Sequence, residues 1–539
     1  MKKSIFKAIP YLILVTIIAL VCAVLEGALS ISMMKTIDIA VSGNMDSFKS
    51  EAIKLIILAL SILPASILLS FGKGLYKRKA ILSAKINFVS RVFKKNINEF
   101  QRDNNAKYVS ALTNDVNTIE TNYIDGIYEV ILGIIYSIVS VGVIAYVSPV
   151  ALGIGTGIGV ISTLLSILIG RPMQKHHNQR SELYEGYTSY IKEVLSAFHI
   201  IKSNNLTDKV KSDFYNKSHS IQQKGYIIDK IYTYISALQN LNMILALMAL
   251  LGISAYMAIK GSLTLGGVIL IINNMEKIIV PIMRFGEWMP KIFATKKLFS
   301  KIEDTLTNQD NYEETISLES FNDSIEFSNV TFGYEDEDIL QNISLSLKKG
   351  EKYLVIGPSG GGKSTLLKLL RKYFSPKSGE ILIDNQNLKD IIKTSYFRHI
   401  SNIEQNVFLF EDTLKNNITL YKDFSDEEIN TAIENAGLKS FIEALPQGLD
   451  TIIYDNGKNI SGGEKSRVAI ARGLLQKADI IFLDEAFASL DSKIAKEIEN
   501  TILNLEGITV VNVSHVIFEE SKKKYDNVFV VKNKGVYSV

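Results

Sequence analysis

Residues 353–370 read YLVIGPSGGGKSTLLKLL, and this stretch decides the fold of the carboxyl-terminal half. Its first four residues form a short apolar run that predicts a buried strand, and its last residues predict a helix. Between them, glycines let successive backbone amides turn inward around phosphate groups. Lys363 can then reach the β- and γ-phosphate oxygens, and the Ser364 hydroxyl is available to Mg²⁺. The stretch predicts a nucleotide site with these binding residues: Gly357, Pro358, Ser359, Gly360, Gly361, Gly362, Lys363, Ser364 and Thr365.

Two more apolar runs in this half end in ionisable residues. Residues 480–483 are followed by Asp484 and Glu485, and residues 509–514 lead to His515. We expect Asp484 to bind Mg²⁺ directly or through water, and Glu485 to polarise the attacking water. His515 is a candidate for contacting the γ-phosphate. Taken alone, an acidic pair that closes a strand is usually a turn, and a single histidine is usually structural.

A second candidate anion site lies between these runs. Ser461, Gly462, Gly463 and Glu464 precede a predicted helix at 465–475. Free amides and the positive end of the helix dipole favour phosphate at such an entrance. Because the chain already has one phosphate-binding loop, the simplest interpretation is that the second site serves the nucleotide of a partner subunit.

The composition sets limits on the class of protein. The chain has 539 residues, of which 47% are hydrophobic and 21% charged, a single cysteine and a mean hydropathy of +0.16. These values exclude collagenous, disulfide-rich and disordered proteins. Residues 1–310 have 33 basic against 21 acidic residues (+12), and residues 311–539 have 26 against 35 (−9). The net charge of +3 is therefore no argument for nucleic-acid binding, and we expect no nucleic-acid partner.

The basic half is also the apolar half. A helix needs about 20 mostly apolar residues to cross a bilayer. The break at Ser148-Pro149 divides one long uncharged run into two spans, because proline stops a helix. Residues 306–320 form a polar linker, and residues 321–539 alternate between strand-like and helical segments. We predict a transmembrane domain at residues 1–305, with spans at about 8–34, 53–72, 128–147, 150–170, 231–259 and 263–284.

Basic residues give this topology an orientation. Residues 72–129 and 171–230 each contain ten lysines or arginines, and the other loops contain few. Cytoplasmic loops are enriched in such residues, so both long loops and both termini are predicted to be cytoplasmic. The alternative for the amino terminus is a secretory signal peptide beginning at Lys2, Lys3 and Lys7. It is disfavoured, because the apolar stretch is too long and no small-residue cleavage site follows it.

Taken together, these motifs resemble those of ATP-binding cassette (ABC) exporters of the half-transporter kind, over nearly the whole chain. In that comparison, residues 357–365 are Walker A, 461–464 the signature and 480–485 Walker B, while Asp491 belongs to the D-loop and His515 is the switch histidine. The resemblance also implies that Tyr334 stacks on adenine and that Gln405 lies near Mg²⁺ with a catalytic role. Each of these two residues has a simpler alternative as a buried or turn residue. Residues 108–116 and 197–205 resemble the two coupling-helix regions of the family.

The resemblance implies a fold and a function. The fold is an all-α six-helix transmembrane domain with long cytoplasmic helical extensions, followed by an α/β P-loop ATPase domain. The function is ATP-driven export of a hydrophobic or amphipathic substrate (a drug, lipid or peptide) by a dimer that binds ATP between one chain's Walker A and the other's signature. A homodimer is favoured over a similar half-transporter partner, because Glu485, His515 and the signature are all present. The alternative is a nucleotide-gated channel or sensor subunit of the same type.

Two departures from the family pattern are visible. Glu464 stands where the signature usually has glutamine, and Asp455 stands where glutamate is usual. Polar residues inside a span usually face a bundle interior or a cavity, so four residues of the sixth span are candidates for lining a transport path. The alternative is that they form polar pairs within the helices, with the lysine reaching toward water. The four residues are Asn273, Asn274, Glu276 and Lys277.

The membrane in question is predicted to be the bacterial cytoplasmic membrane, where the chain would be a multi-pass protein in contact with lipid. A composition rich in Lys, Ile and Asn favours a bacterium with an AT-rich genome.

Overall fold

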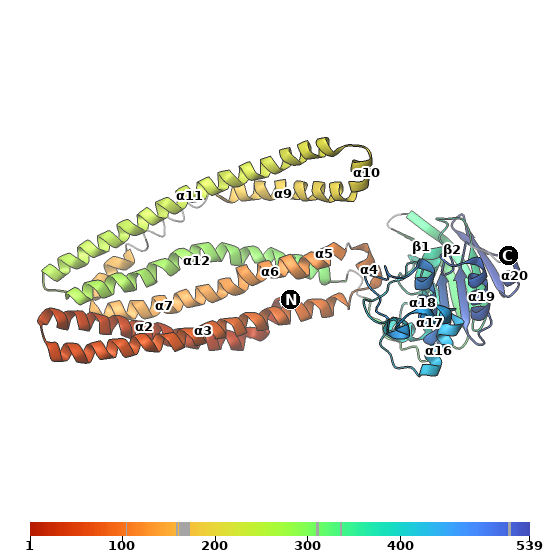
Figure 1. The fold of residues 1–539 in the computed structure, drawn as a ribbon, viewed down its shortest axis with the longest axis horizontal. Coiled ribbons are helices and arrows are strands. Elements are labelled where there is room, and N and C mark those ends of the chain that lie inside the picture. The colour runs from red at the N-terminus through yellow and green to blue at the C-terminus, as the bar shows by residue number, and fades with distance from the viewer. Residues whose placement is uncertain (104, 158–159, 161–172, 309–311, 335–336, 516–518) are drawn as a thin grey trace. The chain divides into compact units, whose positions relative to one another are not determined.

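The computed structural model describes the chain except for residues 104, 158–159, 161–172, 309–311, 335–336 and 516–518. Its contacts divide the chain into two compact units (Figure 1). The helical unit contains Met1–Lys95 and Asp103–Thr307, and the sheet unit contains Asn96–Arg102 and Asn308–Val539. The boundary between Thr307 and Asn308 lies at the start of the predicted linker, directly after the last long helix ends at Leu306.

Long apolar helices make up the helical unit. Within the described residues, five helical stretches are long and apolar enough to cross a membrane. Four of the six predicted spans fall within them, and a fifth, 263–284, begins two residues before the stretch Leu265–Leu306. Most of the predicted fourth span, 150–170, lies outside the described residues. The elements are α1 (Lys2–Ile5), η1 (Phe6–Ala8), α2 (Ile9–Ser42), α3 (Met45–Val92), α5 (Asn105–Ser110), the π-helical segments η2 (Ala111–Asp115) and η3 (Glu120–Ile124) on either side of α6 (Val116–Ile119), α7 (Asp125–Val147), α9 (Met173–Ser196), α10 (Phe198–Ser203), α11 (Thr207–Ile259) and α12 (Leu265–Leu306).

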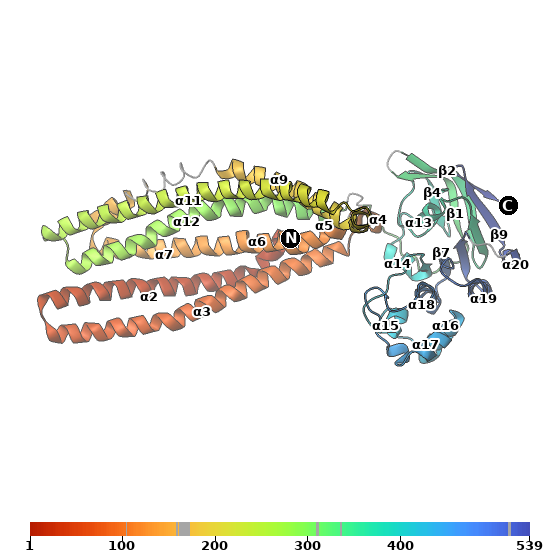
Figure 2. The same cartoon turned by 45° about the horizontal axis from the view of Figure 1, so that its top comes forward.

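Local sequence fixes the first hairpin of this unit. Helix α2 ends at Ser42 and is followed by Gly43, which has a left-handed φ of +75°. Asn44 caps α3 by accepting a hydrogen bond from the amide of Ser47. The two helices then lie side by side (Figures 1 and 2). The most apolar part of α3 is hardly buried, whereas that of α12 is half buried against its neighbours. Lipid is the natural cover for an exposed apolar helix face of this length.

The two regions that resemble coupling helices, 108–116 and 197–205, both lie in the helical unit. The segment of the amino-terminal half that groups with the sheet unit is instead Asn96–Arg102, which contains α4 (Ile97–Arg102). It is held there by hydrogen bonds from the Asn96 amide to Asn308 Oδ1 (3.1 Å) and from Lys393 Nζ to Asn96 Oδ1 (2.8 Å). The predicted second region, 197–205, forms α10 and its flanking turns between α9 and α11.

The sheet unit is built from two sheets and the helices that cover them. One sheet is antiparallel in the order β2-β1-β4-β5, and the other has the order β10-β9-β3-β8-β7-β6 with parallel pairing from β9 to β6. The strands are β1 (Ser324–Tyr334), β2 (Glu337–Lys348), β3 (Lys352–Ile356), β4 (Ser378–Ile383), β5 (Gln386–Asn387), β6 (Ile400–Ile403), β7 (Ile480–Asp484), β8 (Thr509–Val513), β9 (Asn527–Lys532) and β10 (Gly535–Ser538).

Two apolar cores hold this unit together. One lies between the antiparallel sheet, helix α13 and the parallel sheet, and the other lies between β6–β8 and the helices α15–α19. Figure 2 shows α15 to α18 gathered on one side of the unit and β1, β2 and β4 on the other. The helices are α13 (Lys363–Leu370), α14 (Lys393–His399), α15 (Leu414–Thr419), α16 (Asp426–Asn435), α17 (Lys439–Ala444), η4 (Gly448–Asp450), α18 (Gly462–Leu475), α19 (Ser492–Leu503) and α20 (Glu519–Lys522).

Candidate functional site

Four neighbouring parallel strands bring the predicted site residues to one edge of the sheet. In the order β3-β8-β7-β6, the strands lead to the phosphate-binding loop, to His515, to Asp484 and Glu485, and to Gln405. The carboxyl ends of parallel strands share an edge, which is where such folds bind ligands. The fold therefore gathers residues that are more than 150 positions apart in the sequence.

The loop after β3 is shaped by glycine. Gly357, Gly360 and Gly362 have φ values of +151°, +77° and +105°, and residues other than glycine rarely adopt positive φ values of this kind. Helix α13 begins at Lys363 with no side chain capping its first amides. Lys363 Nζ donates to the carbonyl oxygens of Gly357 (2.9 Å) and Pro358 (3.0 Å), and burial lowers the pKa of this ammonium group. The lysine thus lies folded over an amide-rich loop.

The remaining loop residues divide between rim and interior. Pro358, Ser359 and Gly360 are exposed, Gly361 is half-buried and Thr365 is buried. Ser364 is exposed, and its Oγ lies 3.5 Å from Asp484 Oδ1. A hydroxyl and a carboxylate oxygen thus meet at the mouth of the loop, and both belong to residues that the sequence suggests as metal ligands.

Asp484 is the last residue of β7 and is largely enclosed. Its Oδ2 lies 3.6 Å from Nη1 of Arg371. Burial raises the pKa of the Asp484 carboxyl, the Arg371 guanidinium opposes that rise, and the neighbouring carboxylate of Glu485 adds to it. The two oxygens of Asp484 therefore face different partners, a hydroxyl on one side and a buried guanidinium on the other.

Glu485 has an unusual backbone and two side-chain partners. Its φ of +51° lies in the left-handed region, and its amide donates to the carbonyl of Val513 on β8 (2.9 Å). Gln405 Nε2 donates to Glu485 Oε2 (2.8 Å), and His515 Nε2 lies 3.1 Å from Oε1. Strained backbone of this kind concentrates at functional sites. The structure thus brings together all three predicted catalytic residues, Glu485, Gln405 and His515.

Sequence reasoning missed Arg371 and Glu404. Arg371 follows α13 and is 2% exposed, and its Nη1 donates to Glu404 Oε1 (3.4 Å) in addition to facing Asp484. Tyr373 OH donates to the same oxygen of Glu404 (3.3 Å). A basic residue after a helix is common at a surface, so neither periodicity nor spacing distinguished Arg371.

The predicted adenine-stacking residue, Tyr334, lies at the end of β1. Its ring packs edge-on against Phe332 and Phe374, with centroids 5.4 Å apart in both cases. Lys368 of α13 places Nζ 5.7 Å from the ring centroid and 3.4 Å from the hydroxyl. Tyr334 is half-buried and thus stands beside the helix that follows the phosphate-binding loop.

The signature segment forms a capping box. Ser461 Oγ accepts the amide of Glu464 (3.3 Å), and Glu464 Oε2 accepts the amide of Ser461 (2.7 Å). The Glu464 amide is therefore not free, contrary to our expectation for this helix entrance. The capping box also gives a structural reason for glutamate at this position, because the carboxylate accepts strongly at a helix amino terminus.

The glycines of the signature adjoin the D-loop of the same chain. A Cβ on Gly463 would meet the carbonyl oxygen of Ser489 at 3.2 Å, while Gly462 is exposed and has more space. Asp491 is exposed and precedes α19 as its N-cap residue, without a side-chain hydrogen bond to the helix amides. Asp491 and Ser461 thus belong to one surface region of the sheet unit.

The residues present fit ATP with Mg²⁺. The loop offers uncapped amides, left-handed glycines and a buried lysine, which suit phosphate oxygens. Ser364, Asp484 and Gln405 supply only oxygen ligands, which suit Mg²⁺.

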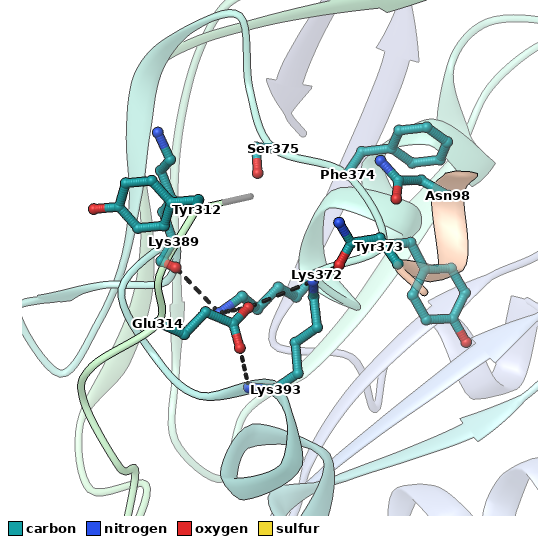
Figure 3. A pocket seen from close by; sticks show the side chains of 10 residues that line it. Asn98, Tyr312, Glu314, Lys372, Tyr373, Phe374, Ser375, Lys389 and Lys393 are labelled. Carbon is teal, nitrogen blue, oxygen red and sulfur yellow. Dashed lines mark hydrogen bonds and ion pairs between the residues drawn. The ribbon is translucent and has the colours of Figure 1, made fainter. Parts of the chain in front are cut away.

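A small cavity of about 40 Å³ lies elsewhere in the sheet unit, between the linker, α4 and the segment after α13. Figure 3 shows Glu314 lying between Lys372 and Lys393. Glu314 Oε1 is 3.0 Å from Lys372 Nζ and 3.5 Å from Lys393 Nζ, and Oε2 accepts the Lys393 amide (2.8 Å). Burial alone would raise the pKa of Glu314, but these hydrogen bonds and charges lower it below its usual range. The linker is therefore anchored to the sheet unit beside α4.

The four polar residues of the sixth predicted span lie on different faces of α12. Asn273 and Glu276 are exposed, and Asn274 is buried with Nδ2 donating to the Leu270 carbonyl (3.0 Å). Lys277 Nζ is paired with Glu26 of α2 (2.7 Å) and so does not reach toward water alone. Tyr136 of α7 donates to the same carboxylate (3.1 Å). The Glu26 carboxylate of α2 therefore joins three helices of the helical unit, through an ion pair with α12 and a hydrogen bond from α7.

Comparisons with known proteins agree with the two units. Residues 12–282 match the family described as ABC transporter transmembrane region, and residues 340–488 match the family described as ABC transporter. The solved structure of a bacterial Atm1-family ABC exporter with ATP bound has the same fold, with a TM-score of 0.81 over 98% of this chain and 95% of that chain, at 21% identity.

Curated relatives span most of the chain. The ATP-dependent lipid A-core flippase of Syntrophus aciditrophicus is 27% identical over 92% of this chain and 84% of its own length. The uncharacterized ABC transporter ATP-binding protein YfiC of Bacillus subtilis is 26% identical over 80% of this chain and 72% of its own length. The mitochondrial iron-sulfur clusters transporter ATM1 of Saccharomyces cerevisiae is 36% identical over 55% of this chain and 44% of its own length. The chain therefore belongs to the ABC exporters, ATP-hydrolysing membrane proteins, and carries the transmembrane region and the ATPase domain of that family in one polypeptide.

Proposed function

We propose that this ABC exporter moves a hydrophobic or amphipathic substrate, a drug, lipid or peptide, out of a bacterial cell as a dimer of identical chains. The observation that carries the proposal is the arrangement at Glu485. Its carboxylate stands on a left-handed residue at the end of β7, with Gln405 and His515 on its two oxygens. A channel or sensor subunit has no need of a hydrolytic carboxylate positioned in this way.

Residues of this chain divide the work of hydrolysis. Lys363 and the loop amides would bind the β- and γ-phosphates, and Tyr334 would stack on the adenine ring. Ser364, Asp484 and Gln405 would hold Mg²⁺, which neutralises charge on the phosphate oxygens when bound. Glu485 would accept a hydrogen bond from the attacking water and His515 would contact the γ-phosphate. A P–O bond then forms to the water oxygen and the bond to the β,γ-bridging oxygen breaks, which gives ADP and phosphate.

The carboxylate of Glu485 must turn toward water for this step. In the structure both of its oxygens are engaged, by Gln405 and by His515. We interpret this as a resting arrangement, in which the carboxylate is held by protein donors until nucleotide draws Gln405 and His515 toward phosphate and metal. Alternating hydrogen-bond partners in this way would couple nucleotide binding to activation of the carboxylate.

The second subunit would complete each ATP site. Ser461, Gly462, Gly463 and Glu464 lie at the start of α18, with Asp491 nearby, on a helix entrance that one chain's own nucleotide does not require. A helix amino terminus favours phosphate. Two identical chains arranged head to tail would each contribute this entrance to the ATP of the other.

The transport path would be lined in part by Asn273 and Glu276. Both are exposed on α12, in a helix that is otherwise apolar enough to span a membrane. Polar side chains in such a helix avoid lipid and face a cavity or another subunit. The pairing of Lys277 with Glu26 argues against a free cationic charge in the path.

The orientation follows from the basic loops. We propose that both termini and the ATPase domain are cytoplasmic, because residues 72–129 and 171–230 each carry ten basic residues. Closure of the ATPase domains would reach the membrane helices through residues 108–116 and 197–205, the regions that resemble the coupling helices of the family. The bilayer itself, through its lipid, is the remaining partner.

The deciding experiment measures ATP hydrolysis and transport by this chain alone in proteoliposomes, with Glu485→Gln as the blank. The panel contains hydrophobic cations, lipids and small peptides. We expect basal hydrolysis that one class stimulates, with ATP-dependent movement of that class across the bilayer. No hydrolysis above the blank would refute the homodimer. Nucleotide-dependent ion conductance without substrate movement would favour the channel alternative.

A further inference from the structure

We infer that Arg371 is a positioning residue for the metal ligand Asp484, and that Glu404, the residue before Gln405, anchors it. The inference rests on the proposed function, because it concerns how the Mg²⁺ site of that ATPase is built.

The first step is that the two oxygens of the Asp484 carboxylate have different neighbours. Oδ2 lies 3.6 Å from Arg371 Nη1, and Oδ1 lies 3.5 Å from Ser364 Oγ. A cation at one oxygen restricts rotation about the last side-chain bond of the aspartate. Arg371 therefore keeps Oδ1 directed at the mouth of the phosphate-binding loop, where Mg²⁺ would be held by Ser364.

The second step is the environment of Arg371. It is 2% exposed, and neither Nε nor Nη2 makes a hydrogen bond within the part of the chain that the structure describes. Burying a guanidinium is costly unless carboxylates compensate it. The only carboxylates that face it among the described residues are Asp484 and Glu404. Packing alone does not call for a charged group here, because a methionine or leucine would fill the same volume.

The third step is the match between two pairs of consecutive residues. Strands β6 and β7 are parallel neighbours, with Ile403 opposite Leu483. Glu404 and Gln405 directly follow Ile403, and Asp484 and Glu485 directly follow its partner Leu483. Gln405 donates directly to Glu485, while Glu404 reaches Asp484 through the shared Nη1 of Arg371. The loop after β6 is thus linked to both carboxylates of the site.

Lys372, the residue next to Arg371, supplies a matched control (Figure 3). Lys372 is also buried, at 7% exposure, and is paired with a carboxylate, that of Glu314. Its contacts are with Glu314 of the linker and with the carbonyls of Lys389 and Ile391, and among the described residues none is with Asp484. Lys372→Met therefore removes a neighbouring buried cation of similar setting without touching the metal ligand.

The test measures metal binding rather than turnover. Mn²⁺ binding to the full-length, ATP-loaded protein is followed by electron paramagnetic resonance in the Glu485→Gln background. Metal-free nucleotide affinity is measured in parallel with a fluorescent ATP analogue in EDTA. Substitution of residues that orient a metal ligand typically weakens metal affinity by about 10- to 100-fold. We expect Arg371→Met to weaken Mn²⁺ binding by about tenfold or more, with metal-free nucleotide affinity within about twofold of the parent.

Two further variants complete the test. Arg371→Lys keeps the charge and is expected to lose less affinity than Arg371→Met. Glu404→Gln, at an exposed position, is expected to weaken Mn²⁺ binding by about threefold, the size of one partly exposed ion pair. If Arg371→Met fails to fold, Arg371→Lys and Glu404→Gln still decide the matter.

Three results would overturn the inference. Unchanged or tighter Mn²⁺ binding in Arg371→Met would show that Arg371 only repels the metal or fills space. Equal losses in Arg371→Met and Lys372→Met would indicate a general structural effect. Unchanged binding in both Arg371→Lys and Glu404→Gln would also refute it. If the parent protein itself binds no Mn²⁺ with ATP, the proposed function fails instead.

Discussion

The side-chain amide of Gln405 donates a 2.8 Å hydrogen bond to Oε2 of Glu485, across 80 positions of sequence. Glu485 has little freedom of its own, since its left-handed backbone is held by the hydrogen bond that its amide donates to the Val513 carbonyl, and its other carboxylate oxygen faces His515. The contact therefore sets where the carboxylate points before nucleotide arrives.

Gln405→Ala removes this donor and leaves the backbone unchanged. We expect ATP hydrolysis to fall on the order of 100-fold, because the variant loses both a proposed Mg²⁺ ligand and the donor that holds Glu485 before nucleotide binds, and moving a catalytic group by about 1 Å has an effect of that size. Nucleotide binding is expected to persist, since the loop amides and Lys363 are untouched. The measurement is steady-state hydrolysis together with nucleotide binding, with Gln405→Glu as the control that restores length but not the donor. Full activity in Gln405→Ala would show that the contact has no catalytic role.

The left-handed backbone of Glu485 makes a separate prediction about stability. A non-glycine residue in this region costs roughly 1–2 kcal/mol, and a β-branched side chain is worse. We expect Glu485→Gly to be at least as stable as the parent and Glu485→Val to be less stable by about 1–2 kcal/mol, although both abolish hydrolysis. Thermal unfolding of the purified full-length variants gives the comparison. Equal melting temperatures for the two variants would mean that the backbone is not strained at this position.

The phosphate-binding loop offers a matched pair of glycines. A Cβ at Gly362 would meet Leu340 Cδ2 at 3.0 Å and Ile339 Cγ2 at 3.2 Å, whereas a Cβ at Gly360 would meet nothing within 4 Å. Both residues have positive φ, so both alanine variants carry backbone strain, but only Gly362→Ala adds a clash. We expect Gly362→Ala to lower ATP affinity on the order of tenfold more than Gly360→Ala. Equal affinities in a titration with fluorescent nucleotide would contradict this steric explanation.

Much of the site could be predicted from sequence, because its chemistry is encoded in short local runs. The strand, loop and helix at 353–370 and the acidic pair after β7 each carry their signal within a few residues. The parallel sheet then brings the ends of these runs together without further information. The family assignment and the two-domain organisation rest on the same local motifs.

The features of the fold and the site that sequence did not predict depend on contacts between segments that are distant in the sequence. The proposed role of Arg371 depends on its contacts with Glu404 after β6 and Asp484 of β7. No residue near Arg371 in the sequence indicates these contacts. Lys277 finds Glu26 across 251 positions. The segment that joins the sheet unit begins at Asn96, about ten residues before the predicted coupling region, because its docking is set by Lys393 and Asn308. The left-handed backbone of Glu485 was also not predictable from sequence, since glutamate normally favours right-handed backbone.

A buried polar cluster behind the site gives the last prediction. Glu499 of α19 is 3% exposed, and its Oε1 accepts hydrogen bonds from Tyr525 OH (2.7 Å) and Asn512 Nδ2 (3.4 Å). Burial raises the pKa of Tyr525, which therefore stays a donor. Asn512 lies on β8, three residues before His515, so the cluster ties α19 to the strand that carries the histidine.

Tyr525→Phe removes the shorter of these two donors from a buried carboxylate. We expect the variant to lose about 1.5–3 kcal/mol of stability, the usual contribution of a hydrogen bond to a charged group. In a Glu499→Gln background the same change should cost clearly less, because a neutral amide tolerates a missing donor better than a charge does. The four proteins form a double-mutant cycle, read by the thermal unfolding of the full chain and by hydrogen exchange of the β8 amides. If Tyr525→Phe costs the same in both backgrounds, the stabilisation comes from the hydrogen bond that the hydroxyl accepts from Asn512 Nδ2 (2.6 Å) and not from the charge on Glu499.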